Sequence, residues 1–348
     1  MKTLFSILKT SFLTISAIIG AGFITGRELV GYFGVENFEI YSLVSALLFF
    51  GGFYLIFSLG RAENSYNELH EKMLKNTGGK LMSTAVIISA FVSLCSLFSA
   101  MDSLTKSLGF FGGFPFLSIV AILVVSNTSK YGIKGLEKIN SVLVPVILFA
   151  LVLALAFKGD FKLEFNVEFD GIKSTKTLLF VTMNIFINLP VIFSSARGKS
   201  KKTLLFSAII SALILSLLTF FMLGAIAVGG EKTGSADMPL LSAVGGGYAM
   251  LFAVALFTAL ASSVTTAYYP LYEVAVKLDG KRGVIVMGIV SFAFSRLGLK
   301  TIVDYVYPII GGFGLIYVII CLVYVTRKNI SIKGQKKADN KTKQEAEK

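Results

Sequence analysis

The chain has 348 residues, of which 55% are hydrophobic and only 15% are charged, and it carries a formal net charge of +13. Soluble chains contain about 25% charged residues, so a chain this apolar lacks the polar side chains to cover a surface in water. The composition excludes an ordinary soluble domain. It predicts an integral membrane protein made of about ten transmembrane helices.

Apolar runs bounded by charged residues predict these spans in chain order. Their ranges are 10–34, 40–60, 81–108, 115–127, 139–157, 176–196, 203–228, 247–276, 282–296 and 301–326. The fourth and ninth runs are the shortest. We therefore expect one membrane domain over 1–326, followed by a basic tail, 327–348, whose polar, Lys-rich composition predicts disorder.

Most of the 33 Lys and Arg residues lie between the apolar runs and in the tail. An even number of spans places both termini on one side, and that side receives the larger share of the basic residues. Because basic loops stay in the cytoplasm, we predict that both termini are cytoplasmic and that the protein lies in the cell membrane. Orientation explains the basic excess, so the expected partner is the lipid bilayer and not nucleic acid. The oligomeric state stays open.

Two long loops lie on the opposite side, at 158–175 and 229–246. The first alternates Phe and Leu and predicts a short extended segment. In the second, the run 237–241 predicts either a surface helix over an entrance or a plain connector. His70, the one histidine of the chain, lies among loop charges and is expected to be solvated.

The first span contains Gly20, Gly22 and Gly26, followed directly by Arg27 and Glu28. Glycine readily leaves helical geometry, and a broken helix at membrane depth is tolerated where it lines a cavity or is packed in protein. The glycines indicate either an unwound point in mid-membrane or close helix packing through small residues. The charged pair favours the break, because ionisable groups in spans usually mark function.

The sixth span contains a second candidate break. Asn184 and Asn188 are one helical turn apart and share a face. Pro190 cannot donate a backbone hydrogen bond to the carbonyl of Phe186. This pattern predicts either an interrupted helix or a kinked helix with two packing asparagines.

The two candidate breaks stand at corresponding places, because the first and sixth spans each begin a half of five spans. Interrupted segments at such places are typical of inverted-repeat transporters, where half-helix ends and freed carbonyls bind the solute and the coupling ion. We therefore predict an all-α transmembrane fold with inverted repeats at 1–157 and 176–326, in which helices 1 and 6 are discontinuous.

The stretch from Ile18 to Glu28, IIGAGFITGRE, resembles the glycine signature of the YkvI-like bacterial membrane proteins. These are relatives of the amino acid–polyamine–organocation and sodium:neurotransmitter symporter superfamily. The resemblance implies the LeuT-type fold over nearly the whole chain. The chain departs from the signature at Arg27, where the family has Gln, so any role of that Gln does not carry over.

The resemblance also implies a sodium site, the one ion expected besides the solute. In sodium-coupled members, first-span carbonyls and eighth-span hydroxyls hold the ion. Matching the glycines implies the carbonyls of Ser16 and Ile19, and the eighth span would add the Ala259 carbonyl with the Ser262 and Ser263 hydroxyls. Oxygen ligands of this kind suit a hard cation.

Two alternatives to this cation site stay open. The serines can bond back to their own helix and fill space, or an alignment shifted by one residue can select Thr258, Ala261 and Ser262. Proton-coupled relatives often carry a lysine on the fifth span in place of sodium. The fifth span here has no lysine, and Asn140 and Ser141 are its clearly polar residues, which favours sodium.

The same resemblance implies a gate. Arg27 follows the first break, and Asp304 lies near the start of the tenth span. In related symporters, Arg and Asp at such positions close over the substrate through a charge-assisted pair. The alternatives are two independent interfacial charges, or Glu28 as the partner of Arg27.

Together these features predict a secondary active transporter that moves a small amino acid or amine by alternating access, with sodium as the coupled cation. Free amides around Ala21 and Gly22 would hold a carboxylate of the solute, if it has one. The full set of expected solute contacts is Gly20, Ala21, Gly22, Phe23, Asn184, Asn188 and Tyr268, with Phe186 as a further apolar wall residue.

Other classes of function remain as alternatives. A non-transporting membrane sensor or assembly protein could use the same fold, with the 61–80 loop and the basic tail as its working surfaces. A membrane enzyme is not expected, because the sequence shows no catalytic dyad. A channel would more often show a repeated ring of polar pore residues.

Overall fold

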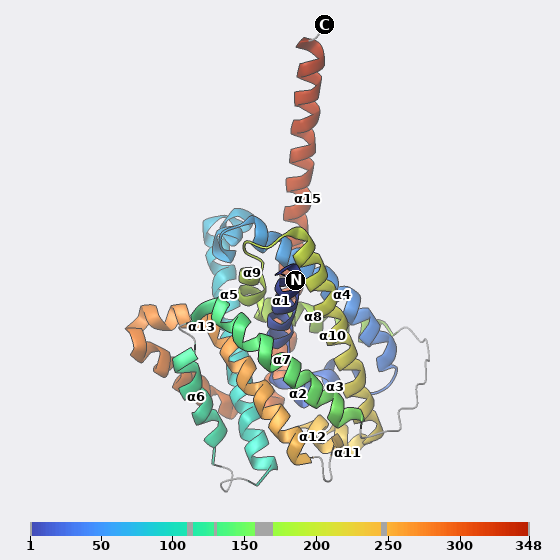
Figure 1. The fold of residues 1–348 in the computed structure, drawn as a ribbon, viewed down its shortest axis with the longest axis vertical. Coiled ribbons are helices and arrows are strands. Elements are labelled where there is room, and N and C mark those ends of the chain that lie inside the picture. Colours follow the sequence, from blue (N-terminus) through green and yellow to red (C-terminus); the bar gives the residue numbers. More distant parts are fainter. Residues whose placement is uncertain (1, 110–113, 129–130, 157–169, 245–248, 347–348) are drawn as a thin grey trace.

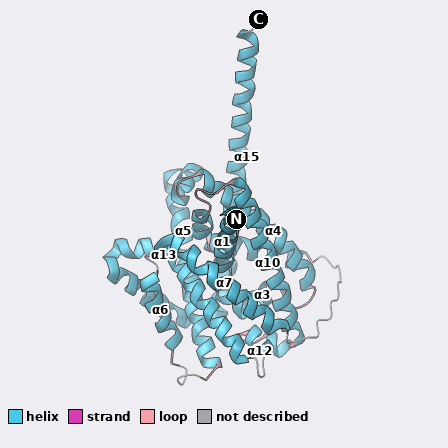
Figure 2. Ribbon diagram, in the orientation of Figure 1, coloured by secondary structure: helices cyan, strands magenta, loops and turns pink. Residues whose placement is uncertain are grey.

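The computed structural model describes residues 2–109, 114–128, 131–156, 170–244 and 249–346. Every regular element within these ranges is a helix (Figures 1 and 2). A helix satisfies all of its backbone hydrogen bonds within one segment, which is what a chain needs when it is surrounded by lipid.

The helices follow one another with short connections. In chain order they are α1 (Lys2–Ile18), α2 (Ala21–Thr25), α3 (Arg27–Phe33), α4 (Phe38–Ala62), α5 (Tyr66–Ser107), α6 (Phe116–Thr128), α7 (Gly132–Ala156), α8 (Gly171–Ile187), α9 (Leu189–Ser195), α10 (Lys201–Val228), α11 (Glu231–Gly234), α12 (Pro239–Val244), α13 (Ala249–Phe294), η4 (Ser295–Leu297), α14 (Leu299–Thr301), the π-helical η5 (Ile302–Val306) and α15 (Tyr307–Ala346). Each apolar run of the sequence lies on one or more of them. The eighth and ninth runs share α13, which turns at Asp279 and Gly280.

Within the part of the chain that the structure describes, five helical segments are long and apolar enough to cross a membrane: α4, α5, α10, residues 250–280 of α13, and residues 299–328. A sixth forms if α8 and α9 count as one span, bent by 68°. The protein is therefore a multi-pass helical membrane protein. Crossing by the shorter helices, including α6 and the second arm of α13, stays a prediction.

The two interrupted segments are surrounded by the longer helices. α1 packs against α7, α10 and α13, while α8 packs against α4 and α15. Serines join α1 to α10: the Ser207 hydroxyl donates to the Ile7 carbonyl at 3.1 Å and the Ser11 hydroxyl to the Ser207 carbonyl at 3.4 Å. Small polar residues of this kind let two helices approach closely in a membrane.

The prediction that His70 is solvated is wrong, because its side chain is fully buried. α5 begins at Tyr66, upstream of the expected span, and turns at Lys75. His70 Nδ1 lies 2.9 Å from the Ser83 hydroxyl, and Nε2 lies 3.2 Å from the Tyr317 hydroxyl of α15. The charged segment is thus folded onto the bundle, and its histidine is a hydrogen-bonded core residue.

Glu63 joins three helices where α4 ends. Its carboxylate accepts from Lys72 of α5 at 2.5 Å and from Lys328 of α15 at 3.1 Å, and the Tyr324 hydroxyl lies 3.4 Å away. Burial raises the pKa of Glu63, but the hydrogen bonds and charges of the two lysines outweigh it, so the pKa lies below its ordinary value. The carboxylate therefore stays ionised and clamps the helix ends together.

The loop predictions have different outcomes. Residues 239–241 of the run 237–241 form the first turn of α12. Buried residues of α12 pack this helix against α2, α10 and α13. The extended segment expected within 158–175 lies mostly outside the described residues, which resume at Asp170. α15 continues to Ala346 and projects from the bundle (Figure 1), where the sequence predicts a disordered tail. Good helix formers such as Lys, Gln, Glu and Ala explain the helical course.

Candidate functional site

The first break lies between α1 and α2. α1 ends at Ile18, and the Gly20 amide bonds back to the Ile18 carbonyl at 2.6 Å instead of continuing the helical pattern. Gly20 is extended (φ −84°, ψ −172°) and caps α2. α2 ends after one turn at Gly26, where φ is +83° and α3 begins. The glycine-rich stretch is therefore an interrupted helix. Of the two interpretations of the glycines, an unwound point or close helix packing, the first is the one that the backbone shows.

Carbonyls freed at this break converge on α13. The Ser263 hydroxyl contacts the Ile19 carbonyl, lies 3.5 Å from the Ser16 carbonyl and 2.9 Å from the Ala259 carbonyl. A hydroxyl has one hydrogen to donate, so it can satisfy only one of three acceptors. Four oxygens crowded in this way form a concentration of negative partial charge that suits a hard cation.

The Ser262 hydroxyl belongs to a neighbouring cluster. It donates to Asn140 Oδ1 at 2.6 Å and lies 2.9 Å from the Ser16 hydroxyl, which itself lies 2.9 Å from the same Asn140 oxygen. Asn140 comes from α7, and its Nδ2 is buried without a hydrogen-bond partner among the described residues. The expected Ser262 ligand thus sits beside the carbonyl cluster, held by a residue of the fifth span that the sequence marks only as polar.

The alternative alignment of the cation site does not converge. The Thr258 hydroxyl bonds to the Val254 carbonyl of its own helix, in an exposed position. Thr258 and Ser263 are five residues apart, about 140° around a helix, so both cannot face α1. The geometry selects Ser263.

The second break lies between α8 and α9, at Asn188. The Asn188 side chain donates to the Asn184 carbonyl at 2.9 Å, and the Asn184 side chain donates to the Phe180 carbonyl at 3.0 Å. Pro190 falls in the first turn of α9, where a missing amide hydrogen costs nothing. The sixth span is therefore interrupted, and its two asparagines lie on the buried face beside the break.

Aromatic rings join the two breaks. Phe23 of α2 stacks on Phe180 of α8, with ring centroids 6.2 Å apart, and Tyr32 and Phe33 of α3 also contact Phe180 at 5.6 and 5.0 Å. Phe180 was not among the predicted site residues, although its position one turn before Asn184 places it on the same face.

Two predicted wall residues lie elsewhere. Phe186 packs against Tyr317 of α15, with centroids 5.6 Å apart. The Tyr268 hydroxyl donates to the Val284 carbonyl in the second arm of α13. Tyr268 follows Ser263 by five residues, so a rotation of about 140° turns it away from the first break.

The expected gate residues form an ion pair. Arg27 Nη2 lies 2.6 Å from Asp304 Oδ2, and both side chains are largely buried. A cavity of about 330 Å³ adjoins the pair and is lined in part by Tyr32, Lys176 and Asp304. Tyr32 also contacts Phe180, so the cavity reaches the aromatic rings. The ion pair leaves Glu28 without the Arg27 side chain as a partner.

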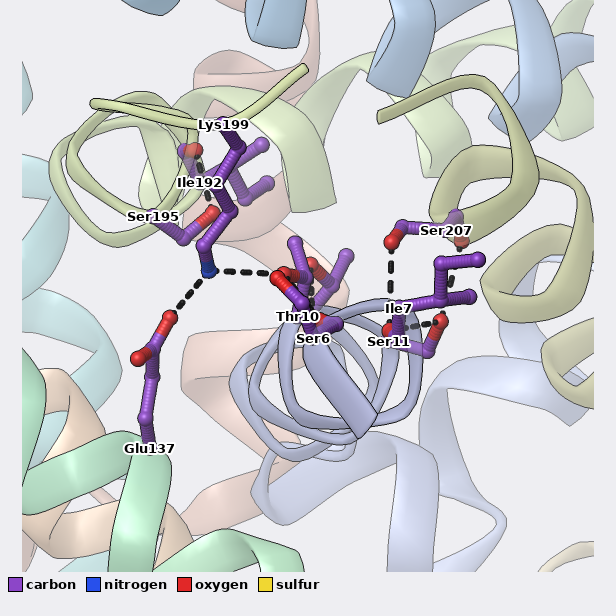
Figure 3. A network of polar contacts seen from close by, with 10 residues as sticks. Ser6, Ile7, Thr10, Ser11, Glu137, Ile192, Ser195, Lys199 and Ser207 are labelled. Atoms are coloured by element: carbon purple, nitrogen blue, oxygen red, sulfur yellow. Dashed lines mark hydrogen bonds and ion pairs between the residues drawn. The ribbon is translucent and has the colours of Figure 1, made fainter. Parts of the chain in front are cut away.

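A second ion pair lies beside the middle of α1 (Figure 3). Lys199, which follows α9, contacts Glu137 of α7 and donates to the Thr10 hydroxyl of α1 at 2.6 Å. Both charged side chains are largely buried. This contact, which we call the α1 lock, joins three separate segments, and sequence spacing alone contains no signal for it.

The described residues contain no group of three or more His, Cys, Asp or Glu side chains placed to hold a metal ion. The oxygens around Ser263 are backbone carbonyls. The fold and the site define a helical membrane protein with two interrupted segments that meet in its interior.

Comparisons with known proteins give the following similarities. No family model matches the chain. The uncharacterized protein YyaD of Bacillus subtilis (strain 168) is 22% identical over 332 residues, covering 91% of this chain and 96% of that protein. Two mutant structures of the Eremococcus coleocola manganese transporter are each 16% identical with a TM-score of 0.44, covering 94% of this chain and 73% of theirs. The same transporter with an aromatic bis-isothiourea substituted compound has 15% identity and a TM-score of 0.42, with 94% and 72% covered.

Proposed function

We propose that the chain is a secondary active membrane transporter that couples the uptake of a small amine or amino acid to a sodium ion by alternating access. The observation that carries this proposal is the convergence of the Ser16, Ile19 and Ala259 carbonyls on the Ser263 hydroxyl at the break of the first span. In a continuous helix the Ser16 and Ile19 carbonyls would bond to amides four residues on. The Ala259 contact is the bond that a serine makes back to its own helix, so the two α1 carbonyls are what support the proposal.

The proposed solute site lies between the two breaks. Its members are the backbone at Gly20, Ala21 and Gly22, the ring of Phe23, and the side chains of Asn184 and Asn188, all of which are buried or nearly so. Phe180 joins them as the ring that Phe23 stacks on. Buried amide groups next to interrupted helices can bind polar groups of a solute that has left water.

Helix packing supports the proposed inverted repeat of 1–157 and 176–326. α1 packs on α10 and α7, and α8 packs on α4 and α15. When the first five expected spans are superposed on the last five, α1 corresponds to α8, α4 to α10, and α7 to α15. The two sets of contacts are then equivalent, as an inverted repeat requires.

The two ion pairs supply the proposed barriers. Arg27–Asp304 closes the end of the site next to α3, and the α1 lock closes the end next to α9. Alternating access would break one pair while the other stays formed. Both termini lie on the side of the α1 lock, which the basic loops predict to be cytoplasmic.

Solute flux in proteoliposomes tests this proposal. Purified full-length chain is reconstituted, and uptake of labelled amines and amino acids is measured with an inward sodium gradient, a proton gradient or neither. Sodium-dependent uptake of at least one solute is expected. Absence of uptake under every gradient would instead favour the sensor or assembly role, and uptake driven only by protons would remove the sodium coupling.

A further inference from the structure

Glu28 occupies the place that the proposed function reserves for an anionic group of the solute. Its side chain folds back from α3 over the first break, so that a Cβ atom added at Gly22 would lie 2.3 Å from Glu28 Cγ and from Oε1. A side chain at position 22 would therefore displace the Glu28 carboxylate. The Gly22 and Phe23 amides and the Asn184 side chain lie beside the Glu28 carboxylate, so the amides expected to hold a solute carboxylate already face one.

The two oxygens of the Glu28 carboxylate differ in their surroundings. Glu28 is 2% exposed, and its Oε2 is buried without a hydrogen-bond partner among the described residues. A buried polar atom in that condition is costly and usually signals a missing partner. Because Oε1 faces Gly22, the unpartnered Oε2 is the atom left to receive a ligand.

No positive charge of the chain neutralises Glu28 in the part that the structure describes. The ion pairs there use Arg27 with Asp304, Lys199 with Glu137, Arg296 with Asp102, and Lys72 and Lys328 with Glu63. The titratable groups that face Glu28 are the phenols of Tyr32 on α3 and Tyr307 on α15. A lone carboxylate at membrane depth must either take up a proton or meet a positive group from outside the chain.

The surroundings suit an ammonium group. Tyr307 lies beside Ser93 and Ser96 of α5, and the Ser96 hydroxyl is buried. The phenols, the serine hydroxyl and Glu28 Oε2 are hydrogen-bond acceptors, and an ammonium group carries several N–H donors. The Phe23 and Phe180 rings offer an apolar surface for the rest of a small amine.

We propose that Glu28 is the counter-charge for the ammonium group of the transported solute, which is therefore an amine that needs no carboxylate of its own. This inference rests on the proposed function and narrows its substrate class. The chain supplies from α3 the carboxylate that an amino acid would bring, and an added solute carboxylate would meet Glu28 at the same amides and be repelled.

Matched pairs of ligands test this inference. Binding to the full-length protein in detergent, with sodium present, is measured by thermal shift and titration calorimetry. The probes are ethylamine against alanine, isobutylamine against valine, and phenethylamine against phenylalanine. Within at least one pair, the amine is expected to bind about tenfold tighter than the amino acid or better.

Glu28→Gln supplies the decisive variant, because the amide keeps the shape and one acceptor oxygen while it removes the charge. We expect amine affinity to fall about tenfold or more, while stabilisation by sodium stays intact and shows that the protein is folded. Glu39→Gln, at a buried glutamate in the first turn of α4, is the matched control and should leave amine binding unchanged.

The outcomes separate this inference from the proposed function. Amine affinity unchanged in Glu28→Gln, or tighter binding of amino acids than of amines, overturns the inference and leaves sodium-coupled transport standing. Loss of a proton-gradient response in Glu28→Gln with amine affinity unchanged would mean that Glu28 carries a proton, which also overturns it. If no amine or amino acid binds or is taken up, both proposals fail together.

Discussion

Removal of the Ser263 hydroxyl is the most direct test of the cation site. Ser263→Ala deletes the one side-chain oxygen around which the Ile19, Ser16 and Ala259 carbonyls gather. It leaves three carbonyls with neither a hydroxyl donor nor a fourth oxygen for the ion. The substitution removes a single atom, so packing changes little, and the expected effect falls on sodium binding.

The magnitude follows from mass action. Sodium at about 100 times its Kd stabilises the folded state by about 2.7 kcal/mol. If the loss of one of four oxygens weakens binding about 100-fold, the same sodium concentration stabilises the variant by only about 0.4 kcal/mol. At about 2 cal/mol/K of unfolding entropy per residue, the difference of about 2.3 kcal/mol corresponds to a loss of about 3 °C in the sodium-dependent Tm shift.

The assay compares the Tm in sodium with the Tm in an equal concentration of potassium, so that ionic strength cancels. Thr258→Ala is the matched control, because its hydroxyl bonds only to the Val254 carbonyl of the same helix. A full sodium shift in Ser263→Ala would refute the site. An equal loss in both variants would show that the effect comes from α13 in general and not from the carbonyl cluster.

Three further predictions concern the ion pairs and the packing. Arg27→Ala and Asp304→Ala should be non-additive in their effect on transport, with a coupling energy of about 0.5–3 kcal/mol in a double-mutant cycle; additive effects would show that the pair seen at 2.6 Å has no role. Lys199→Ala should lower stability by about 1–3 kcal/mol, because it leaves a buried carboxylate unpaired, and should speed thiol labelling of a cysteine placed in α1; unchanged labelling would argue against a barrier there. Gly314→Ala should destabilise by about 1–3 kcal/mol, since its Cβ would lie 2.3 Å from a carbonyl oxygen of α8, whereas Gly312→Ala, with open space around it, should be close to neutral in thermal unfolding.

The breaks could be predicted from the sequence because their causes are local. Gly20 and Gly26 allow the backbone to leave helical geometry, and Pro190 cannot donate within a helix. Ten apolar runs likewise predict helices, since each run is a property of its own residues. What stayed open was whether the glycines serve a break or close packing, and the non-helical backbone at Gly20 and Gly26 decides that question.

The rest of the site depends on contacts between distant segments. The choice between Ser263 and Thr258 is a choice of helix rotation, which the packing of α13 on α1 determines. Asn140 and Lys199 take part through neighbours more than 60 residues away. His70 was misread for the same reason, because the charges around it predict a loop while the turn at Lys75 folds it beneath Tyr317.

The position of Glu28 changes how the first break works. Its carboxylate lies beside the Phe23 amide, the group that would bond to the Ile19 carbonyl in a continuous helix. The extended backbone at Gly20 frees the Ile19 carbonyl, which the Ser263 hydroxyl contacts. Glu28 therefore faces the amide side of the break, and Ser263 faces its carbonyl side.

The proposed cation site and the α1 lock lie on the same helix. The carbonyls of the cation cluster stand at one end of α1, and Thr10 of the α1 lock stands on the same helix two turns away. An ion between Ile19 and Ser263 would tie α1 to α13 and so hold Thr10 in reach of Lys199. Loss of the ion removes that tie while leaving the Arg27–Asp304 pair, which belongs to α3 and η5, untouched. Because α1 and α3 are separated by two breaks, the two barriers can respond independently, and that independence is the mechanical requirement of alternating access.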